Sequence, residues 1–156
     1  MRHAIILAGL GAVLVTTAYA QNPGQWTASL RQVRDDRLST PSDSMPGGRS
    51  FGTVVWKTGD TPEMSIVKLS FSTTGVERDL SWAILYGRCR SASLPVAPLS
   101  SFPELDMSGG GSATVSVTLS LDLPAKGLYH VEIYKNREGG EEAVVACGEL
   151  KYSYKG

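Results

Sequence analysis

The chain has no block of like charges and no long apolar run outside its N-terminal segment. Its 15 basic and 15 acidic residues are interspersed. The largest basic cluster consists of Arg88, Arg90 and Lys135, which is too small for the basic stripe of a nucleic-acid-binding surface. The composition therefore argues against a nucleic-acid partner and against a membrane span beyond the N-terminal segment.

The longest apolar stretch lies at the N-terminus. Arg2 precedes an apolar run from Ala4 to Thr16, which is shorter than the roughly 20 residues of a spanning helix. Small residues at Ala18 and Ala20 suit cleavage before Gln21. The sequence thus predicts a signal peptide at residues 1–20 and a single domain at residues 21–156, in a periplasmic or secreted protein. A membrane anchor is the alternative.

Cysteine is scarce, with two residues, Cys89 and Cys147. Two cysteines in an exported domain normally pair. Closing so long a loop would stabilise the fold by roughly 4 kcal/mol, if the gain comes from lost chain entropy. No histidine lies near either cysteine in the sequence, so a structural disulfide is favoured over a redox or copper-binding thiol pair.

No stretch shows a convincing helical period, and apolar residues recur instead with a period of two. From Ser112 to Leu121 they alternate with Ser and Thr, which is typical of a half-buried antiparallel strand. Further strands are predicted at residues 26–33, 51–57, 65–72, 80–86, 127–135 and 142–154, most of them separated by turn-forming residues. The sequence predicts an all-β fold, a Greek-key or immunoglobulin-like antiparallel β-sandwich of about seven to eight strands with one disulfide.

The alternation also assigns side chains to faces. We expect one interior to contain Val67, Leu69, Phe71, Val115, Val117, Leu119, Val131 and Ile133. His130, Glu132 and Tyr134 fall on the other face of their strand. His130 and Glu132 are interpreted as an exposed polar pair, because no nucleophile motif completes a catalytic arrangement.

Two polar connections, residues 34–49 and 88–111, are longer than the rest. Loops of this length are often functional or mobile, and the alternative is a long cross-sheet connection. Scattered methionines such as Met64 and Met107 are expected in packing or loop positions. The tryptophans and most tyrosines are expected in the core and on sheet faces, with an exposed aromatic cluster for glycan or peptide as the alternative.

The order of a strand, Gly-x-Cys, a long loop and Ala-Cys-Gly near the C-terminus resembles the copper/zinc superoxide dismutase family and the related CHRD-type β-sandwich domains. In this chain the matching elements are "YGRC" and "VVACGEL", and the resemblance covers about residues 80–150. It implies a superoxide-dismutase-like β-sandwich in which a disulfide joins Cys89 in the long loop to Cys147 in the final strand.

The family's metal ligands are missing. The strand before Gly-x-Cys carries a His-x-His pair in the dismutases, whereas here the matching positions hold Trp82 and Ile84, or Ala83 and Leu85 in the other register. His130 is the one histidine after the predicted signal peptide, and a copper site of this family takes several imidazoles. We therefore predict no metal ligand, no cofactor-binding residue and no cofactor.

The family's catalytic arginine is missing too. Val144 stands where the dismutases have the arginine that guides superoxide, and Tyr134 stands where CHRD-type domains have a further histidine. Because the metal ligands and the guiding arginine of the family are missing, we predict no catalytic residue and no enzymatic activity. We expect a non-enzymatic protein of the cell envelope that binds an envelope protein or a small ligand. The alternatives are a degenerate dismutase relative with residual metal binding, and a pilus-type subunit with an unpaired sheet edge.

Overall fold

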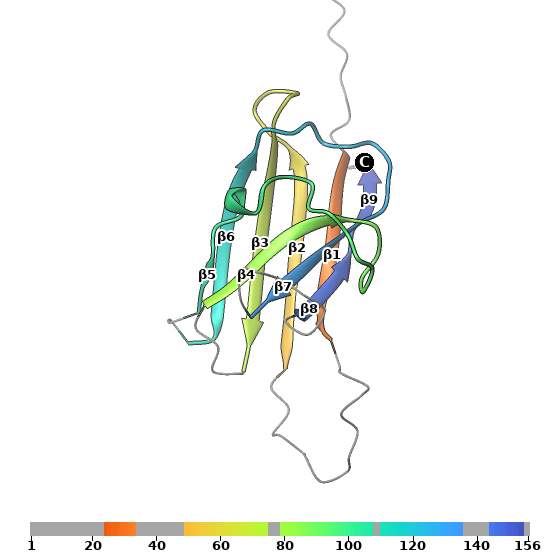
Figure 1. Ribbon diagram of the computed structural model, residues 1–156. Coiled ribbons are helices and arrows are strands. Elements are labelled where there is room, and N and C mark those ends of the chain that lie inside the picture. Colours follow the sequence, from red (N-terminus) through yellow and green to blue (C-terminus); the bar gives the residue numbers. More distant parts are fainter. Residues whose placement is uncertain (1–23, 34–48, 75–78, 108–109, 136–143, 155–156) are drawn as a thin grey trace, which may run out of the picture.

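A computed structural model of the chain describes residues 24–33, 49–74, 79–107, 110–135 and 144–154 (Figure 1). The predicted signal peptide, residues 1–20, and nearly all of the polar connection at residues 34–49 lie outside the described residues. No helix in the described ranges has the length and apolar character needed to cross a membrane.

The described chain is all-β and antiparallel, as predicted. It forms strands β1 (Gly24–Gln32), β2 (Ser50–Thr58), β3 (Ser65–Thr73), β4 (Asp79–Tyr86), β5 (Leu105–Asp106), β6 (Ser112–Leu119), β7 (Tyr129–Tyr134), β8 (Val144–Glu149) and β9 (Lys151–Tyr154). Each predicted strand overlaps at least one of these, and the last contains both β8 and β9, which are divided at Leu150. The short strand β5 lies in a segment that was expected to be a loop.

The strands form one nearly closed sheet with the order β5-β4-β7-β8-β1-β2-β3-β6. Strands β4, β7 and β8 run obliquely across β6, β3, β2 and β1, so the sheet has two layers (Figure 1). The end of β1 pairs with β8 and its beginning pairs with β9, which joins the layers on one side. On the other side β5 and β6, the two ends of the order, are in contact.

The hydrophobic core lies between the two layers. Six of the eight residues predicted for the interior are buried: Val67, Leu69, Phe71, Leu119, Val131 and Ile133. The other two, Val115 and Val117, are half-buried and pack against the same core. The period of two therefore identified the interior face correctly, because successive side chains of a strand point to opposite sides of the sheet.

The described part of the long connection, residues 88–107, is packed into the fold. Pro95 forms an isolated bridge with Leu85 of β4, and a short 3-10 helix, η2, spans Leu99–Ser101. Farther along, Phe102 and Met107 are buried in the core, and the Trp82 indole donates a hydrogen bond to the Pro103 carbonyl (2.8 Å). These contacts favour the cross-sheet connection over a mobile loop.

Candidate functional site

Strand β7 is buried along its whole length and on both faces. Its apolar residues Val131 and Ile133 face the core, as the alternation predicts. The opposite face carries His130, Glu132 and Tyr134. Because β7 lies between β4 and β8 in the sheet, these three polar side chains stand in the middle of a layer rather than at its edge.

The predicted disulfide between Cys89 and Cys147 covers this polar face. The two sulfurs are 1.99 Å apart, and Cys147 lies on β8 directly opposite Glu132 of β7. After β4 the chain turns at Gly87, whose φ of +89° is in the region that favours glycine. Its N–H donates to the Leu128 carbonyl (2.8 Å), and the following turn places Cys89 over β7 and β8.

His130 and Glu132 are therefore not the exposed pair that the sequence predicted. Their relative exposures are 0% and 8%, and Tyr134 is 7% exposed. The prediction of the face was correct, but the assumption that the face meets solvent was wrong. The Cys89–Cys147 disulfide and the backbone N–H of Arg90 lie against Glu132 on this face of β7.

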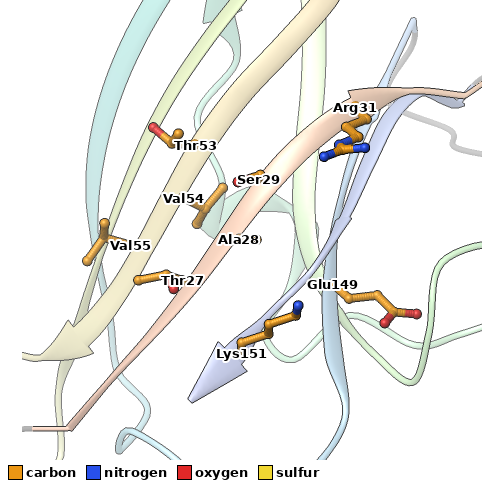
Figure 2. A pocket seen from close by; sticks show the side chains of 9 residues that line it. All are labelled: Thr27, Ala28, Ser29, Arg31, Thr53, Val54, Val55, Glu149 and Lys151. Carbon is orange, nitrogen blue, oxygen red and sulfur yellow. The ribbon is translucent and has the colours of Figure 1, made fainter. Parts of the chain in front are cut away.

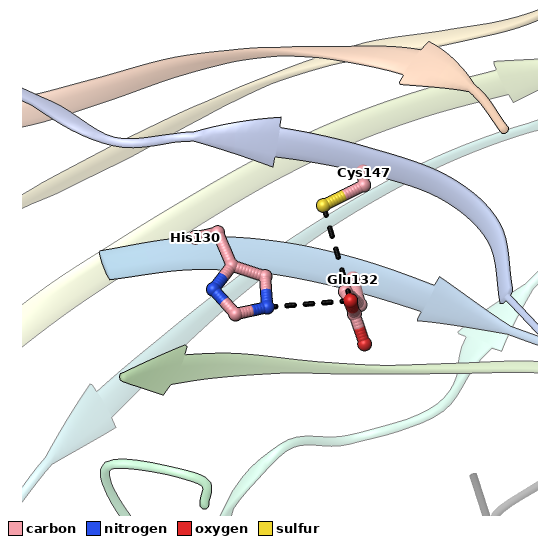
Figure 3. A group of neighbouring side chains, drawn as sticks. All are labelled: His130, Glu132 and Cys147. Atoms are coloured by element: carbon pink, nitrogen blue, oxygen red, sulfur yellow. Dashed lines mark hydrogen bonds and ion pairs between the residues drawn. The ribbon is translucent and has the colours of Figure 1, made fainter. Parts of the chain in front are cut away.

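The cluster is centred on the Glu132 carboxylate (Figure 3). The Tyr134 hydroxyl donates a hydrogen bond to Glu132 Oε2 (2.9 Å), and His130 Nε2 lies 3.3 Å from Glu132 Oε1. Cys147 Sγ lies 4.0 Å from the same Oε1. This last contact is no hydrogen bond in the oxidised protein, because a disulfide sulfur carries no proton.

The electrostatics of the cluster favour an ionised carboxylate. Burial raises the pKa of Glu132, but the contact with His130, the hydrogen bond from Tyr134 and the backbone N–H of Arg90 together lower that pKa below its ordinary value of 4.5. Burial and the neighbouring Glu132 carboxylate raise the pKa of the Tyr134 hydroxyl, so it remains a hydrogen-bond donor. Arg90, whose backbone N–H reaches the carboxylate, has a left-handed backbone conformation, with φ of +66°.

His130 is the unusual member of the cluster. Neither ring nitrogen makes an acceptable hydrogen bond within the described parts of the chain, although Nε2 approaches Glu132 Oε1. Such buried polar atoms are rare, because each lacks the water that it would bind in the unfolded chain. His130, Glu132 and Cys147 also offer ligand atoms that lie within 4.8 Å of one another, which is a spacing suited to a metal ion.

On β4, the two pairs of positions that match the metal ligands of the dismutases lie on opposite faces of the sheet. Trp82 and Ile84 face the core. Ala83 is paired with Glu132, and Leu85 with His130, so the second register lies beside the polar cluster. The alternation did place the three polar residues of β7 on one face, but the pairing of β7 with β8, which brings Cys147 to them, could not be read from the sequence.

A second candidate site is a groove on the outward face of β1 and β2 (Figure 2). It has a volume of about 590 Å³. Its wall carries hydroxyl groups and three charged side chains, and the lining residues are Thr27, Ala28, Ser29, Arg31, Thr53, Val54, Val55, Glu149 and Lys151. No sequence pattern indicated this groove, because its residues come from strands at both ends of the chain.

Comparison of the chain with protein-family models, with curated proteins and with solved structures found no match.

Proposed function

We propose that the protein is an exported, non-enzymatic binding module of the cell envelope, and that its ligand binds in the groove on β1 and β2. The observation that carries this proposal is the composition of the groove wall. Hydroxyl groups of Thr27, Ser29 and Thr53 stand along β1 and β2, and the cationic side chains of Arg31 and Lys151 line the same groove (Figure 2). Such a wall suits a polar ligand with an acidic group, because neutral hydroxyls supply hydrogen bonds and the cations attract the charge.

The buried cluster supports a non-enzymatic role. A catalytic histidine must reach its substrate within hydrogen-bond distance, whereas His130 has no exposed surface. The sulfur nearest to it belongs to a disulfide and is no free nucleophile. The disulfide also supports the proposed export, because such bonds persist chiefly in oxidising compartments.

A superoxide-dismutase-like or CHRD-type ancestry remains part of the proposal. The link between the segment after β4 and the strand β8 is the one that the resemblance implies. The second candidate function, residual metal handling, is favoured by the proximity of His130, Glu132 and Cys147. A pilus-type role is less favoured, because β5 and β6 at the ends of the strand order contact each other.

Binding to an acidic polysaccharide tests the proposal. Polygalacturonic acid would be immobilised beside neutral dextran, and the oxidised mature protein would be passed over both. We expect retention by the acidic polymer alone. Replacing both Arg31 and Lys151 with Ala should abolish it, whereas Lys126→Ala, an exposed loop residue outside the groove, should not. No retention, or equal retention of the groove variant, would contradict the proposed site.

A further inference from the structure

The cluster around Glu132 has a role that differs from ligand binding in the groove. We propose that reduction of the Cys89–Cys147 disulfide converts this cluster into a tetrahedral zinc site. The four ligands are the two thiolates, His130 Nε2 and the Glu132 carboxylate. The inference deepens the second candidate function, residual metal handling, and it does not rest on ligand binding in the groove, which is lined by none of these residues.

Three of the four donor atoms, those of His130, Glu132 and Cys147, already have nearly the spacing that zinc requires. Zinc binds sulfur at about 2.3 Å and nitrogen or oxygen at about 2.0–2.2 Å, so ligand atoms in a tetrahedron lie about 3.3 to 3.8 Å apart. His130 Nε2 and Glu132 Oε1 are 3.3 Å apart, and Cys147 Sγ is 4.0 Å from that oxygen. Cys89 Sγ, which is bonded to Cys147 Sγ, is outside this close group, and breaking the disulfide frees it to move to the fourth position.

The hydrogen-bonding state of His130 is a second, independent observation. The ring is completely buried, and its nitrogens make no hydrogen bond within the described chain. A buried polar atom without a partner destabilises the fold, because it has lost its hydrogen bonds to water. Nε2 points towards the Glu132 carboxylate and the adjoining sulfur (Figure 3). A metal ion at that point would satisfy the nitrogen and neutralise the acidic ligands.

The carboxylate is held ready for coordination. The Tyr134 hydroxyl donates to Oε2, which leaves Oε1 directed at His130 and Cys147. Such outer hydrogen bonds fix the orientation of a metal ligand and typically change affinity by about 10- to 100-fold.

The oxidation state of the disulfide controls the site. A dithiol reductant gives two electrons and two protons to the disulfide, which becomes two thiols while the reductant becomes a disulfide. Zinc then displaces the two thiol protons and binds the thiolates. In the oxidised protein the two sulfurs are bonded to each other and carry no charge. His130 and Glu132 then supply only two of the four zinc ligands. The protein would therefore take up zinc under reducing conditions, and it would release zinc when an oxidising disulfide accepts two electrons from the thiolates and the Cys89–Cys147 bond forms again.

The test compares oxidised and reduced protein. A water-soluble phosphine reduces the disulfide: phosphorus is oxidised and takes its oxygen from water, while two protein thiols form. It is used in place of a dithiol, because an added thiol would compete for the zinc. After removal of excess phosphine without oxygen, zinc is added, and bound metal and melting temperature are measured. We expect one zinc per reduced chain, a melting temperature that rises with zinc concentration, and no such effect in oxidised protein. Cobalt should give a thiolate charge-transfer band.

Variants identify the ligands. His130→Gln and Glu132→Gln should each weaken zinc binding by the reduced protein by about tenfold or more. Ser91→Ala, in the same turn but outside the cluster, should bind like the wild type. Equal binding by His130→Gln, or no binding by the reduced wild type, would overturn the inference. If reduced metal-free protein unfolds, zinc should restore its β-sheet circular dichroism; zinc bound without refolding would also overturn it.

Discussion

Two outward faces of the sheet have similar polar patterns but different environments. On β3 and β6, Ser70 bonds Thr114 (3.2 Å) and Ser72 bonds Ser112 (2.8 Å), and these pairs are exposed. On β7, His130, Glu132 and Tyr134 alternate with apolar residues in the same way but are buried. A pattern of alternating residues identifies a face, and it does not reveal whether another segment covers that face.

The turn around Cys89, which covers the polar face of β7, determines which hydrogen-bond partners the polar side chains can have. Hydroxyls on the β3–β6 face can exchange partners with water, so a lost hydrogen bond there is replaced at little cost. Under the turn around Cys89 no such replacement is at hand, and the Glu132 carboxylate depends on Tyr134, His130 and Arg90. Mutations with similar chemistry should therefore have unequal effects on the two faces.

The largest expected change in the free energy of unfolding comes from breaking the disulfide that holds the turn around Cys89. Cys89→Ser breaks the disulfide and should lower the free energy of unfolding by about 4 kcal/mol, because the unfolded chain regains the freedom of a long loop. Urea denaturation of oxidised wild type and variant measures the loss. Wild type treated with phosphine should match the variant. A difference below about 1 kcal/mol between oxidised wild type and variant would show that the cover contributes little to stability.

A smaller effect is expected from a single hydroxyl beneath the cover. Tyr134→Phe removes the hydrogen bond to the Glu132 carboxylate and should cost about 1.5–3 kcal/mol, since bonds to buried charged groups are the stronger ones. Tyr154→Phe is the matched control, because this tyrosine is 73% exposed. Its free energy of unfolding should equal that of the wild type. Equal losses in both variants would remove the distinction between covered and exposed tyrosines.

Acid should weaken the covered face in particular. The pKa of Glu132 is lower in the folded state than its ordinary value of 4.5, so the stabilisation is complete above that value. It is lost as the pH falls from about 4.5 through the lower folded-state pKa, because protons then bind more tightly to the unfolded chain. Urea denaturation at a series of pH values measures this loss. Glu132→Gln should show a shallower decline, and an unchanged decline would assign the acid sensitivity to other carboxyl groups.

The smallest effect is expected on the exposed face. Ser72→Ala removes a hydrogen bond of 2.8 Å to Ser112, yet water can take the place of the lost partner. The free energy of unfolding should change by no more than about 0.5 kcal/mol. A cost similar to that of Tyr134→Phe would mean that burial does not explain the difference between the two faces. The same urea titration serves both variants.

Several elements were predictable because their causes are local. The alternation in residues 112–121 and 65–72 identified strands β6 and β3 and their buried sides. The number of cysteines and the apolar N-terminus predicted the disulfide. Strand β5 was missed because its two residues, Leu105 and Asp106, are too few to show a period. Its position depends on pairing with the beginning of β4.

The sequence by itself determined the all-β class, most strand positions, the interior side of β3, β6 and β7 and the pairing of the two cysteines. These follow from side-chain alternation and from the chemistry of a cysteine pair, which act along the chain or between two unique residues. Tertiary structure decided that His130 and Glu132 are buried and that Cys147 lies beside them. It also decided that β1, β2 and β9 form a groove. The physical reason is that solvent exposure depends on which distant segment covers a face, and strand pairing sets that relation.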